Sequence, residues 1–372
     1  MIRGIKMTNS ITNRQMFFII FITLSTYTTI DLPKIMVQAA GRSSWIPIII
    51  AAFVFGFGAV IITKLNNMFL GKVFFDYSQR VICKFFAYVI TFYYILYYLV
   101  IGVYLKLKLV GLLTSNFLPN TPDYIFLLFG IALFAFVAYK GITNIARMFE
   151  IYGITFLLVT VLICILMIKD GTKYEVLPFF NPSEIKGYAK TMKELIVPFG
   201  GAEILFIIPF TAKNKNAPRT AFFTLLLIGL FFVLIVESTL MILGINNTIL
   251  LNDSFIEAIK IVDAPVIERL DILYLTVGLA SLFSGITIVF AAVVEFACRL
   301  FPEIKRSLIV ITLSSISFIL CLFALKIQDM EKVFVGFSIY LVIISSFLIP
   351  ITVFIIAKAK KPSGFGNWGK AP

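Results

Sequence analysis

The sequence predicts an all-α integral membrane protein with ten transmembrane helices, and three observations lead to this class. Apolar residues make up 60% of the 372 residues and charged residues only 14%, and the mean hydropathy is +1.02, far outside the range of soluble globular domains. The apolar runs reach the roughly 20 residues that cross a bilayer. Because these runs are continuous, they predict helices, which satisfy their own backbone hydrogen bonds in hydrocarbon.

Ten apolar runs follow one another along the chain. The expected spans are residues 16–39, 45–63, 85–112, 123–139, 149–168, 188–211, 219–243, 268–297, 307–325 and 333–357. The first run is far longer than a signal-peptide core and no small-residue cleavage pattern follows it, so it is expected to remain as a span. The connections are too short for a further soluble domain, and the whole chain is expected to form a single membrane domain.

Shorter features complete the expected organisation. Two connections, Met68 to Tyr77 and Ser254 to Val262, could form short helices at the membrane surface. More than half of the 32 lysine and arginine residues fall on one side of the membrane when the N-terminus is placed in the cytoplasm. The positive-inside rule therefore predicts that both termini and the tail 358–372 are cytoplasmic. The same bias explains the net charge of +13 without nucleic acid as a partner.

The residue types also argue against several chemistries. The chain has no histidine, and its four cysteines are scattered singly, so no metal site or disulfide framework is visible. We expect no cofactor. No phosphate-cradling glycine loop and no nucleophile with a base at a recognisable spacing is present, so an enzyme is not expected.

Two of the ten runs contain residues that break helices. The first run carries LSTYTTIDLPK, Leu24 to Lys34, and the sixth carries VPFGGAEILFIIPF, Val197 to Phe210. Proline removes a backbone donor and glycine costs about 1 kcal/mol in a helix interior. Irregular backbone at membrane depth is tolerated only beside protein or a wet cavity. The alternatives are a simple proline kink and close helix packing at the glycines.

The interrupted runs open two halves of five spans each, about 11–168 and 186–357. Because five is odd, the second half enters the membrane in the opposite sense, which is the arrangement of an inverted repeat. Interrupted segments at matching places in two halves point to a binding site near the middle of the bilayer. This inference depends on spacing alone, since no sequence identity between the halves is detectable.

Acidic residues inside spans are functional candidates because an unpaired carboxylate is costly in hydrocarbon. Glu203 directly follows the break in the sixth run and could carry a proton or receive a ligand ammonium group. Asp31 is the next candidate, although Lys34 could neutralise it as a structural pair. Glu237 in the seventh run is a weaker proton-linked candidate. Glu295 is expected to pair with Arg299.

Hydroxylated residues supply further candidates. The third run contains FYYILYYLVIGVY, in which two tyrosine pairs lie one helical turn apart. One pair could face the cavity, with Tyr97 and Tyr98 as ligand-binding candidates, or the rings could form an interfacial aromatic belt. In the eighth run Ser281, Ser284 and Thr287 share a face and could complete an ion or ligand site, although such hydroxyls often bond to their own helix.

Several short motifs, taken in order, resemble the spore-germination permeases of the GerAB type, a branch of the amino acid, polyamine and organocation transporter superfamily. These motifs are ITNRQMFFIIF at residues 11–21, Leu32-Pro33, AAGRSSW at 39–45, FGGAEILFIIPF at 199–210 and Arg269-Leu270-Asp271. The resemblance covers nearly all of the chain in span number and order. This chain departs from the family pattern at two places. STYTTI stands where the family often has glycine in the break of the first span, and Val277 stands where the family usually has an aromatic residue after Arg269-Leu270-Asp271.

The resemblance implies a fold like that of the leucine transporter, with ligand held between the breaks of spans one and six. Matched by position, the implied pocket residues are Thr26, Tyr27, Thr28, Thr29, Ile30, Gly200, Gly201, Ala202 and Glu203. It also implies a germinant receptor subunit in the spore inner membrane, which binds a nutrient, with an amino acid expected, and works with a larger membrane subunit and a lipoprotein. The alternative is a proton-coupled amino acid transporter that uses Glu203 or Glu237.

Overall fold

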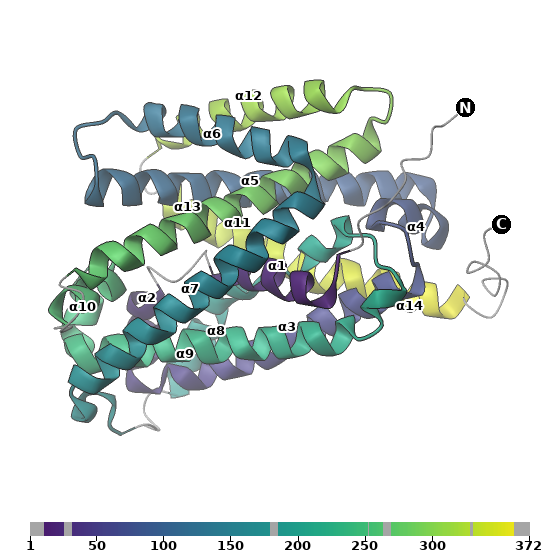
Figure 1. The fold of residues 1–372 in the computed structure, drawn as a ribbon. Helices are drawn as coiled ribbons and strands as arrows, with labels where there is room; N and C mark the ends of the chain where they lie inside the picture. The colour runs from purple at the N-terminus through teal and green to yellow at the C-terminus, as the bar shows by residue number, and fades with distance from the viewer. Residues whose placement is uncertain are drawn as a thin grey trace.

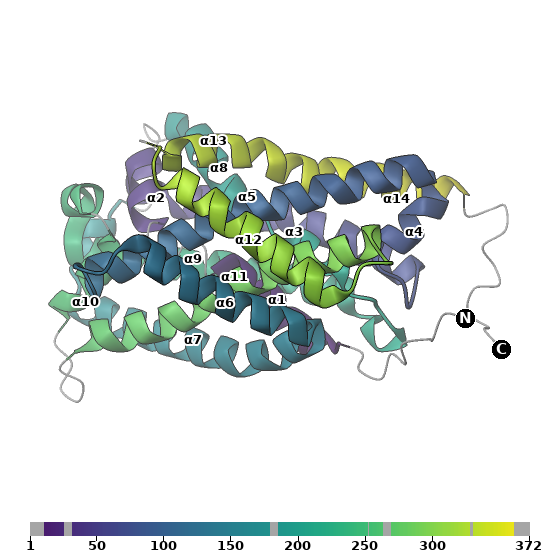
Figure 2. The same cartoon turned by 90° about the horizontal axis from the view of Figure 1, so that it is seen from above.

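The computed structural model describes residues 11–25, 32–178, 185–251, 253–262, 269–327 and 330–360. All its regular elements are helices, and they form one elongated bundle (Figure 1). α1 begins and α14 ends at the same end of this bundle, which we call the Asn13 end; the opposite end is called the Ala40 end. Viewed from above, α13 and α14 lie along one side and α7 along the other (Figure 2).

Eight helical segments among the described residues are long and apolar enough to cross a membrane. One of them, Val333–Lys360, is discussed below. The other seven are α3 Trp45–Met68, α5 Lys84–Asn116, α6 Asp123–Lys140, α7 Ile142–Asp170, α9 Ala217–Leu250, α11 Leu270–Leu300 and α12 Arg306–Ala324. All seven coincide with expected spans, usually with an extra turn at an end. α9 runs beyond the expected end at residue 243 through a kink at Gly244, whose φ is 69°.

The first span is made of two shorter helices, as the sequence predicts. α1 (Asn13–Ser25) is buried over nine of its thirteen residues, and α2 (Leu32–Ala40) continues to the 3₁₀ turn η1 (Gly41–Ser43). Pro33 lies in the first turn of α2, where a missing N–H leaves no helical hydrogen bond unmade. Pro33 therefore lies at the start of the described part of the second helix.

The sixth span is also interrupted. α8 (Ile185–Phe199) ends just after Pro198, and the 3₁₀ helix η4 (Ala202–Ile207) follows two glycines. Gly201 has a φ of 136°, a backbone conformation that side chains on L-residues rarely adopt. Glycine at this position thus allows the chain to leave one helix and start another inside the bundle.

The tenth span has an irregularity that the sequence analysis does not anticipate. It consists of α13 (Met330–Ile343), a π-helical turn η6 (Ile344–Leu348) and α14 (Ile349–Lys360). Pro350 has no N–H to donate to the carbonyl of Ser346 four residues earlier, which disfavours a regular α-helix here. Wide turns of this kind are frequently found at functional sites.

The two halves share a further feature besides their interrupted first spans. In each half a short helix separates the second span from the third: α4 (Phe74–Val81) and α10 (Ser254–Ile261). α4 lies at the Asn13 end and α10 at the Ala40 end (Figure 1). An inverted repeat predicts this placement at opposite ends. The first of the two expected surface helices begins later than expected, at Phe74, because Gly71 adopts a φ of 76° in a turn after α3.

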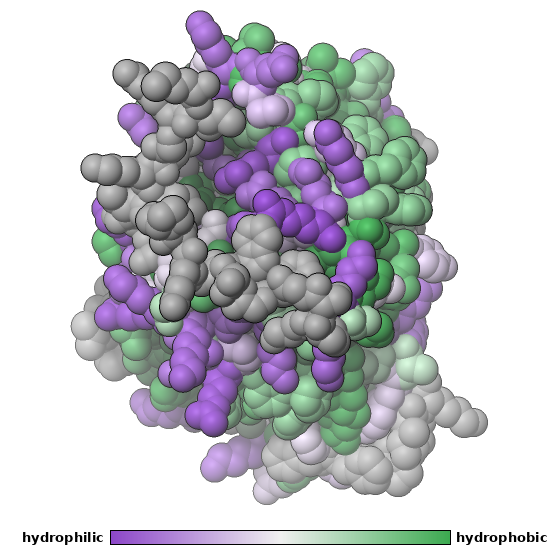
Figure 3. Space-filling view, turned by 90° about the vertical axis from the view of Figure 1, so that its right-hand side faces the viewer, coloured by the Kyte–Doolittle hydropathy of each residue, from purple (hydrophilic) through white to green (hydrophobic). Residues whose placement is uncertain are grey.

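Ion pairs and hydrophilic side chains mark the Asn13 end, where purple patches gather in Figure 3. Arg299 Nη1 lies 3.1 Å from Asp76 Oδ2, and Arg306 Nη2 lies 2.6 Å from Glu295 Oε1. The expected Glu295–Arg299 pair is therefore wrong. The turn after α11 brings Arg306 back to Glu295, while Arg299 reaches α4 instead. The spacing of residues along α11 alone predicts neither the pairing of Glu295 with Arg306 nor that of Arg299 with Asp76.

Candidate functional site

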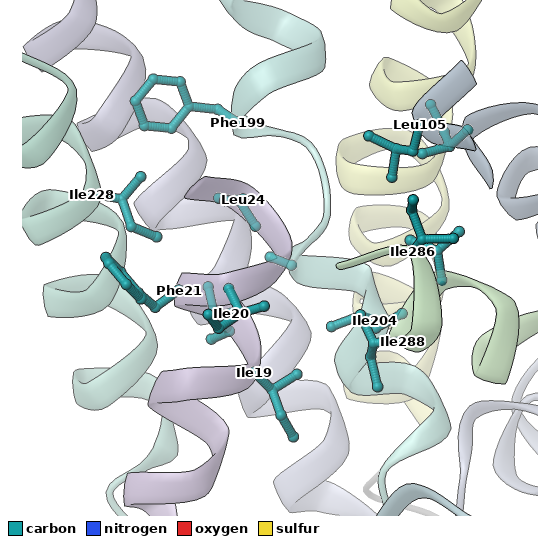
Figure 4. Close-up of a cluster of buried hydrophobic side chains, with 14 of the residues drawn as sticks. Ile19, Ile20, Phe21, Leu24, Leu105, Phe199, Ile204, Ile228, Ile286 and Ile288 are labelled. Carbon is teal, nitrogen blue, oxygen red and sulfur yellow. The ribbon is translucent and has the colours of Figure 1, made fainter. Parts of the chain in front are cut away.

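The two interrupted spans meet in the middle of the bundle. The connection from α8 to η4 runs beside the end of α1, next to Leu24 (Figure 4). A Cβ atom placed on Gly201 would lie 3.0 Å from Leu24 Cδ1 and 3.2 Å from Thr23 Cγ2. A Cβ atom on Gly200 would lie 2.5 Å from Val342 Cγ1 on α13. The glycines thus permit both the break and a close approach of spans one and ten.

Glu203 lies at the start of η4 with no exposed surface. Its Oε1 accepts a hydrogen bond from Tyr97 Oη at 2.5 Å, and its Oε2 accepts from Ser346 Oγ at 2.9 Å. The N–H of Gly201 donates to Oε2 at 3.1 Å. Ser345 Oγ shares its single proton between the Val342 carbonyl at 3.1 Å and Oε1 at 3.5 Å. Four donors from spans three, six and ten therefore surround one carboxyl group.

All four of these donors are neutral. No ion pair joins Glu203 to a lysine or arginine among the described residues. These donors satisfy lone pairs of the carboxyl oxygens without supplying a positive charge. A cationic group that enters the site can supply it.

The tyrosines of α5 form one wall of the site. Tyr93 Oη donates to the Leu341 carbonyl at 2.7 Å, and Tyr94 Oη donates to the Ser345 carbonyl at 2.9 Å. Tyr97 reaches Glu203, as described above. Tyr98 is buried and its ring packs on Tyr97, but its hydroxyl has no partner among the described residues. The tyrosine cluster thus binds span three to the π-helical turn of span ten.

Ser345 and Ser346 are site residues that the sequence analysis misses. Both are buried in η6, and both reach Glu203 from a span with no acidic residue and no glycine pair at that place. The available signal is SSFLIP at residues 345–350, two hydroxyl residues one turn before a proline. Only the packing of span ten against spans three and six shows that these hydroxyls face the site.

The remaining candidates lie in different places. Thr26, Tyr27, Thr28, Thr29, Ile30 and Asp31 fall outside the described residues. Ala202 is buried beside Glu203 at the start of η4. Glu237 lies on α9, and both of its carboxylate oxygens are buried without a hydrogen-bond partner in the described part of the chain. Within the described part of the chain, no hydrogen bond joins Glu237 to the group around Glu203.

The hydroxyl candidates of the eighth span are buried in α11. Ser284 Oγ donates to the Ala280 carbonyl at 2.8 Å, and Thr287 Oγ1 donates to the Phe283 carbonyl at 2.7 Å. Ser281 is also buried. In this structure Ser284 and Thr287 satisfy their own helix, which is the more frequent use of such residues. Among the described residues, no group of three or more acidic or cysteine side chains could hold a metal ion.

Together the fold and the site define a class of protein: a multi-pass helical membrane protein of transporter type, with a buried carboxyl group where two interrupted spans meet. The structure is similar to that of Mhp1, a nucleobase-cation-symport-1 family transporter, in a closed conformation with bromovinylhydantoin bound. The TM-score is 0.68 at 12% sequence identity, over 95% of this chain and 80% of that one. At this identity the similarity shows the fold alone.

The chain belongs to the spore germination protein family, whose model matches residues 10–333. It is also similar to the spore germination protein YndE of Bacillus subtilis (strain 168). The two are 21% identical over 290 residues, which are 77% of this chain and 79% of YndE. These findings confirm the resemblance to germination permeases and the expected leucine-transporter-like fold. The protein is therefore a germination-related permease of transporter type.

Proposed function

We propose that this permease is a germinant receptor subunit that binds a small nutrient through an ammonium group at Glu203. An amino acid is the simplest ligand of this kind. The ligand occupies the space between the breaks of spans one and six, and Gly200, Gly201, Ala202 and residues 26–30 line it. Binding shifts a conformational equilibrium, which a larger membrane subunit and a lipoprotein convert into a germination signal. The protein acts in the spore inner membrane with both termini in the cytoplasm.

One observation carries this proposal: Glu203 is fully buried and receives only neutral donors. A ligand ammonium group supplies the missing positive charge and up to three N–H donors of its own. An ammonium group adds a positive charge that the hydroxyl donors to the same carboxylate cannot supply, and this favours the bound state. The carboxyl group therefore selects for a cationic group on the ligand.

The transporter alternative has its own support. The fold is that of a transporter, and the unpartnered carboxyl group of Glu237 is a second place where a proton could be carried through the span region. In this alternative the same site opens to each side of the membrane in turn and couples an amino acid to a proton. Accumulation of ligand against a gradient distinguishes this function from sensing.

The test uses the full chain reconstituted into proteoliposomes, with a mixture of radiolabelled L-amino acids as probe. We expect saturable binding by the wild type and at least a tenfold loss of affinity in Glu203→Gln, about 1.4 kcal/mol. Glu257→Gln is the control, since Glu257 is a surface residue paired with Lys260 on α10. Equal losses in the two variants would reduce Glu203 to a structural residue.

The same preparation separates the two functions. With a proton gradient imposed across the vesicle membrane, a receptor binds ligand without accumulating it. Gradient-driven accumulation that Glu237→Gln abolishes would instead establish the transporter. Absence of any amino acid binding by wild-type protein would overturn the ligand assignment.

A further inference from the structure

A buried lysine lies in span three, away from the group around Glu203. Lys106 on α5 is only 3% exposed. It belongs to the part of the bundle where α5, α6, α11 and α12 all contact one another, in the upper part of Figure 1. Nine residues separate Lys106 from Tyr97, which places the two side chains on opposite faces of α5. Lys106 therefore faces a part of the bundle that the proposed ligand site does not occupy.

The ammonium group of Lys106 has two close contacts. Its Nζ donates to the Gly102 carbonyl at 3.1 Å and lies 5.7 Å from the centre of the Phe290 ring on α11. Carbonyl oxygens and aromatic faces both attract cations. Gly102 leaves room for this arrangement, because an added Cβ atom there would lie 3.3 Å from Nζ. The side chain is thus directed away from the nearer end of α5, at Asn116, instead of reaching for the membrane surface.

No negative charge compensates this ammonium group among the described residues. None of their ion pairs includes Lys106, and the titratable group in electrostatic range is the Cys321 thiol on α12. Val103 and Val110, about one turn before and after Lys106, pack with Leu127 of α6 and with Cys321. Apolar side chains therefore surround a charged group, which is costly in a membrane interior unless a counter-charge is present.

A hydroxyl on the facing helix is also left without a suitable partner. Ser317 lies one turn before Cys321 on the same face of α12 and is completely buried. Its Oγ adjoins the Cys321 thiol and has no oxygen or nitrogen partner in the described part of the chain. α5 and α12 are spans three and nine, so they cross the bundle in the same direction. Ser317 therefore lies near the level of Gly102, which the ammonium group reaches.

The polar atoms that meet here are mostly donors. An ammonium group has three N–H donors and no acceptor, and the hydroxyl of Ser317 and the thiol of Cys321 each offer one donor more. A water molecule could accept some of these hydrogen bonds but would leave the positive charge uncompensated. A cation would be repelled. A small anion would accept the donors and balance the charge together.

We propose that Lys106 and Ser317 form a site for a small monovalent anion such as chloride, between α5, α11 and α12. The ammonium group supplies the charge, and the serine hydroxyl supplies a second donor from the facing helix. The bound anion stabilises the packing of spans three, eight and nine, because it removes an uncompensated charge from their contact.

The test measures thermal unfolding of the purified full chain in detergent, in sodium chloride and in sodium gluconate at equal ionic strength. Gluconate is too large for a site enclosed by packed helices. We expect chloride to raise the melting temperature by about 2 °C relative to gluconate. The chloride-minus-gluconate difference is the readout, so a change in basal stability does not obscure it. No amino acid is present, so the outcome is independent of the proposed function.

Matched variants locate the effect. Lys106→Met removes the charge at similar volume and should abolish the chloride shift, and Ser317→Ala should at least halve it. Lys108→Met removes a half-buried lysine from the same helix and should retain the full shift. Ser314→Ala should retain it too, since Ser314 Oγ donates to the Val310 carbonyl of its own helix at 2.7 Å.

Three results would overturn the proposal. The first is a wild-type protein with no chloride shift, as an uncharged Lys106 amine would give. The second is a full shift in Lys106→Met or in Ser317→Ala. The third is a loss of the shift in Lys108→Met or in Ser314→Ala, which would place the effect of chloride elsewhere on the protein.

Discussion

At the scale of single residues, the site depends on how one carboxyl group is satisfied. Glu203 receives the hydroxyl of Tyr97 on span three, while Tyr98, the next residue, keeps its hydroxyl without a partner among the described residues. The two tyrosines are both buried and differ mainly in this one hydrogen bond. They therefore form an internal comparison of a hydroxyl that has a charged acceptor with one that has none.

We expect Tyr97→Phe to lower the free energy of unfolding by about 1.5–3 kcal/mol, the range for a hydrogen bond to a charged group. Tyr98→Phe should be neutral or slightly stabilising, because it removes a hydroxyl that has no partner. Thermal unfolding of both variants in detergent checks this prediction.

The effect of Tyr97→Phe should shrink in a Glu203→Gln background, since the acceptor is then uncharged. Equal destabilisation by Tyr97→Phe in the two backgrounds would show that the tyrosine hydroxyl does not act through Glu203.

At the scale of elements, the sixth and tenth spans fit together through a glycine. Gly200 leaves room for Val342, whose Cγ1 would lie 2.5 Å from an added Cβ atom. Val342 is the last residue but one before the π-helical turn that carries Ser345 and Ser346. The close approach at Gly200 therefore helps to hold that turn against Glu203.

We predict that Gly200→Ala destabilises the protein by about 1–3 kcal/mol, because a β-branched valine cannot move aside easily. Gly336→Ala is the matched control on α13, since nothing lies within 4 Å of an added Cβ atom there. Adding Val342→Ala to Gly200→Ala should restore part of the loss. A double variant whose destabilisation equals the sum of the single ones would contradict the contact.

At the scale of the whole molecule, the inverted arrangement decides which segments share a side of the membrane. α4 and the segment before α5 lie at the Asn13 end, and the connection after α5 lies at the Ala40 end. Exposed residues mark both places, Cys83 before α5 and Leu118 after it. The positive-inside rule predicts that the Asn13 end faces the cytoplasm.

A membrane-impermeant maleimide tests this orientation. In intact cells it should label Leu118→Cys in a Cys83→Ser background and leave the wild-type Cys83 unlabelled until the membrane is opened. Cys83→Ser alone is the control for the three remaining cysteines, of which Cys164 and Cys321 are buried and Cys298 is partly exposed. The reverse pattern would invert the assignment, and labelling of both positions from outside would show that α5 does not cross the membrane.

Most of the fold follows from the sequence. Long apolar runs locate the spans because hydrocarbon tolerates few other residues, and Pro33, Pro198 and Gly201 locate the breaks because their backbone chemistry acts locally. The position of Glu203 directly after a break also marks it as a functional candidate, because an acidic side chain in hydrocarbon is costly unless it is paired or has a function. These signals each reside in a few neighbouring residues.

Other features depend on packing between distant segments. Ser345 and Ser346 reach Glu203 from 142 and 143 residues away, and Glu295 pairs with Arg306 rather than with Arg299 on its own helix. The sequence by itself determined the number, order and interruptions of the spans, because the bilayer acts on each segment separately. Only the tertiary structure decided which polar groups meet between the spans, because helix rotation and register depend on neighbours that local sequence does not encode.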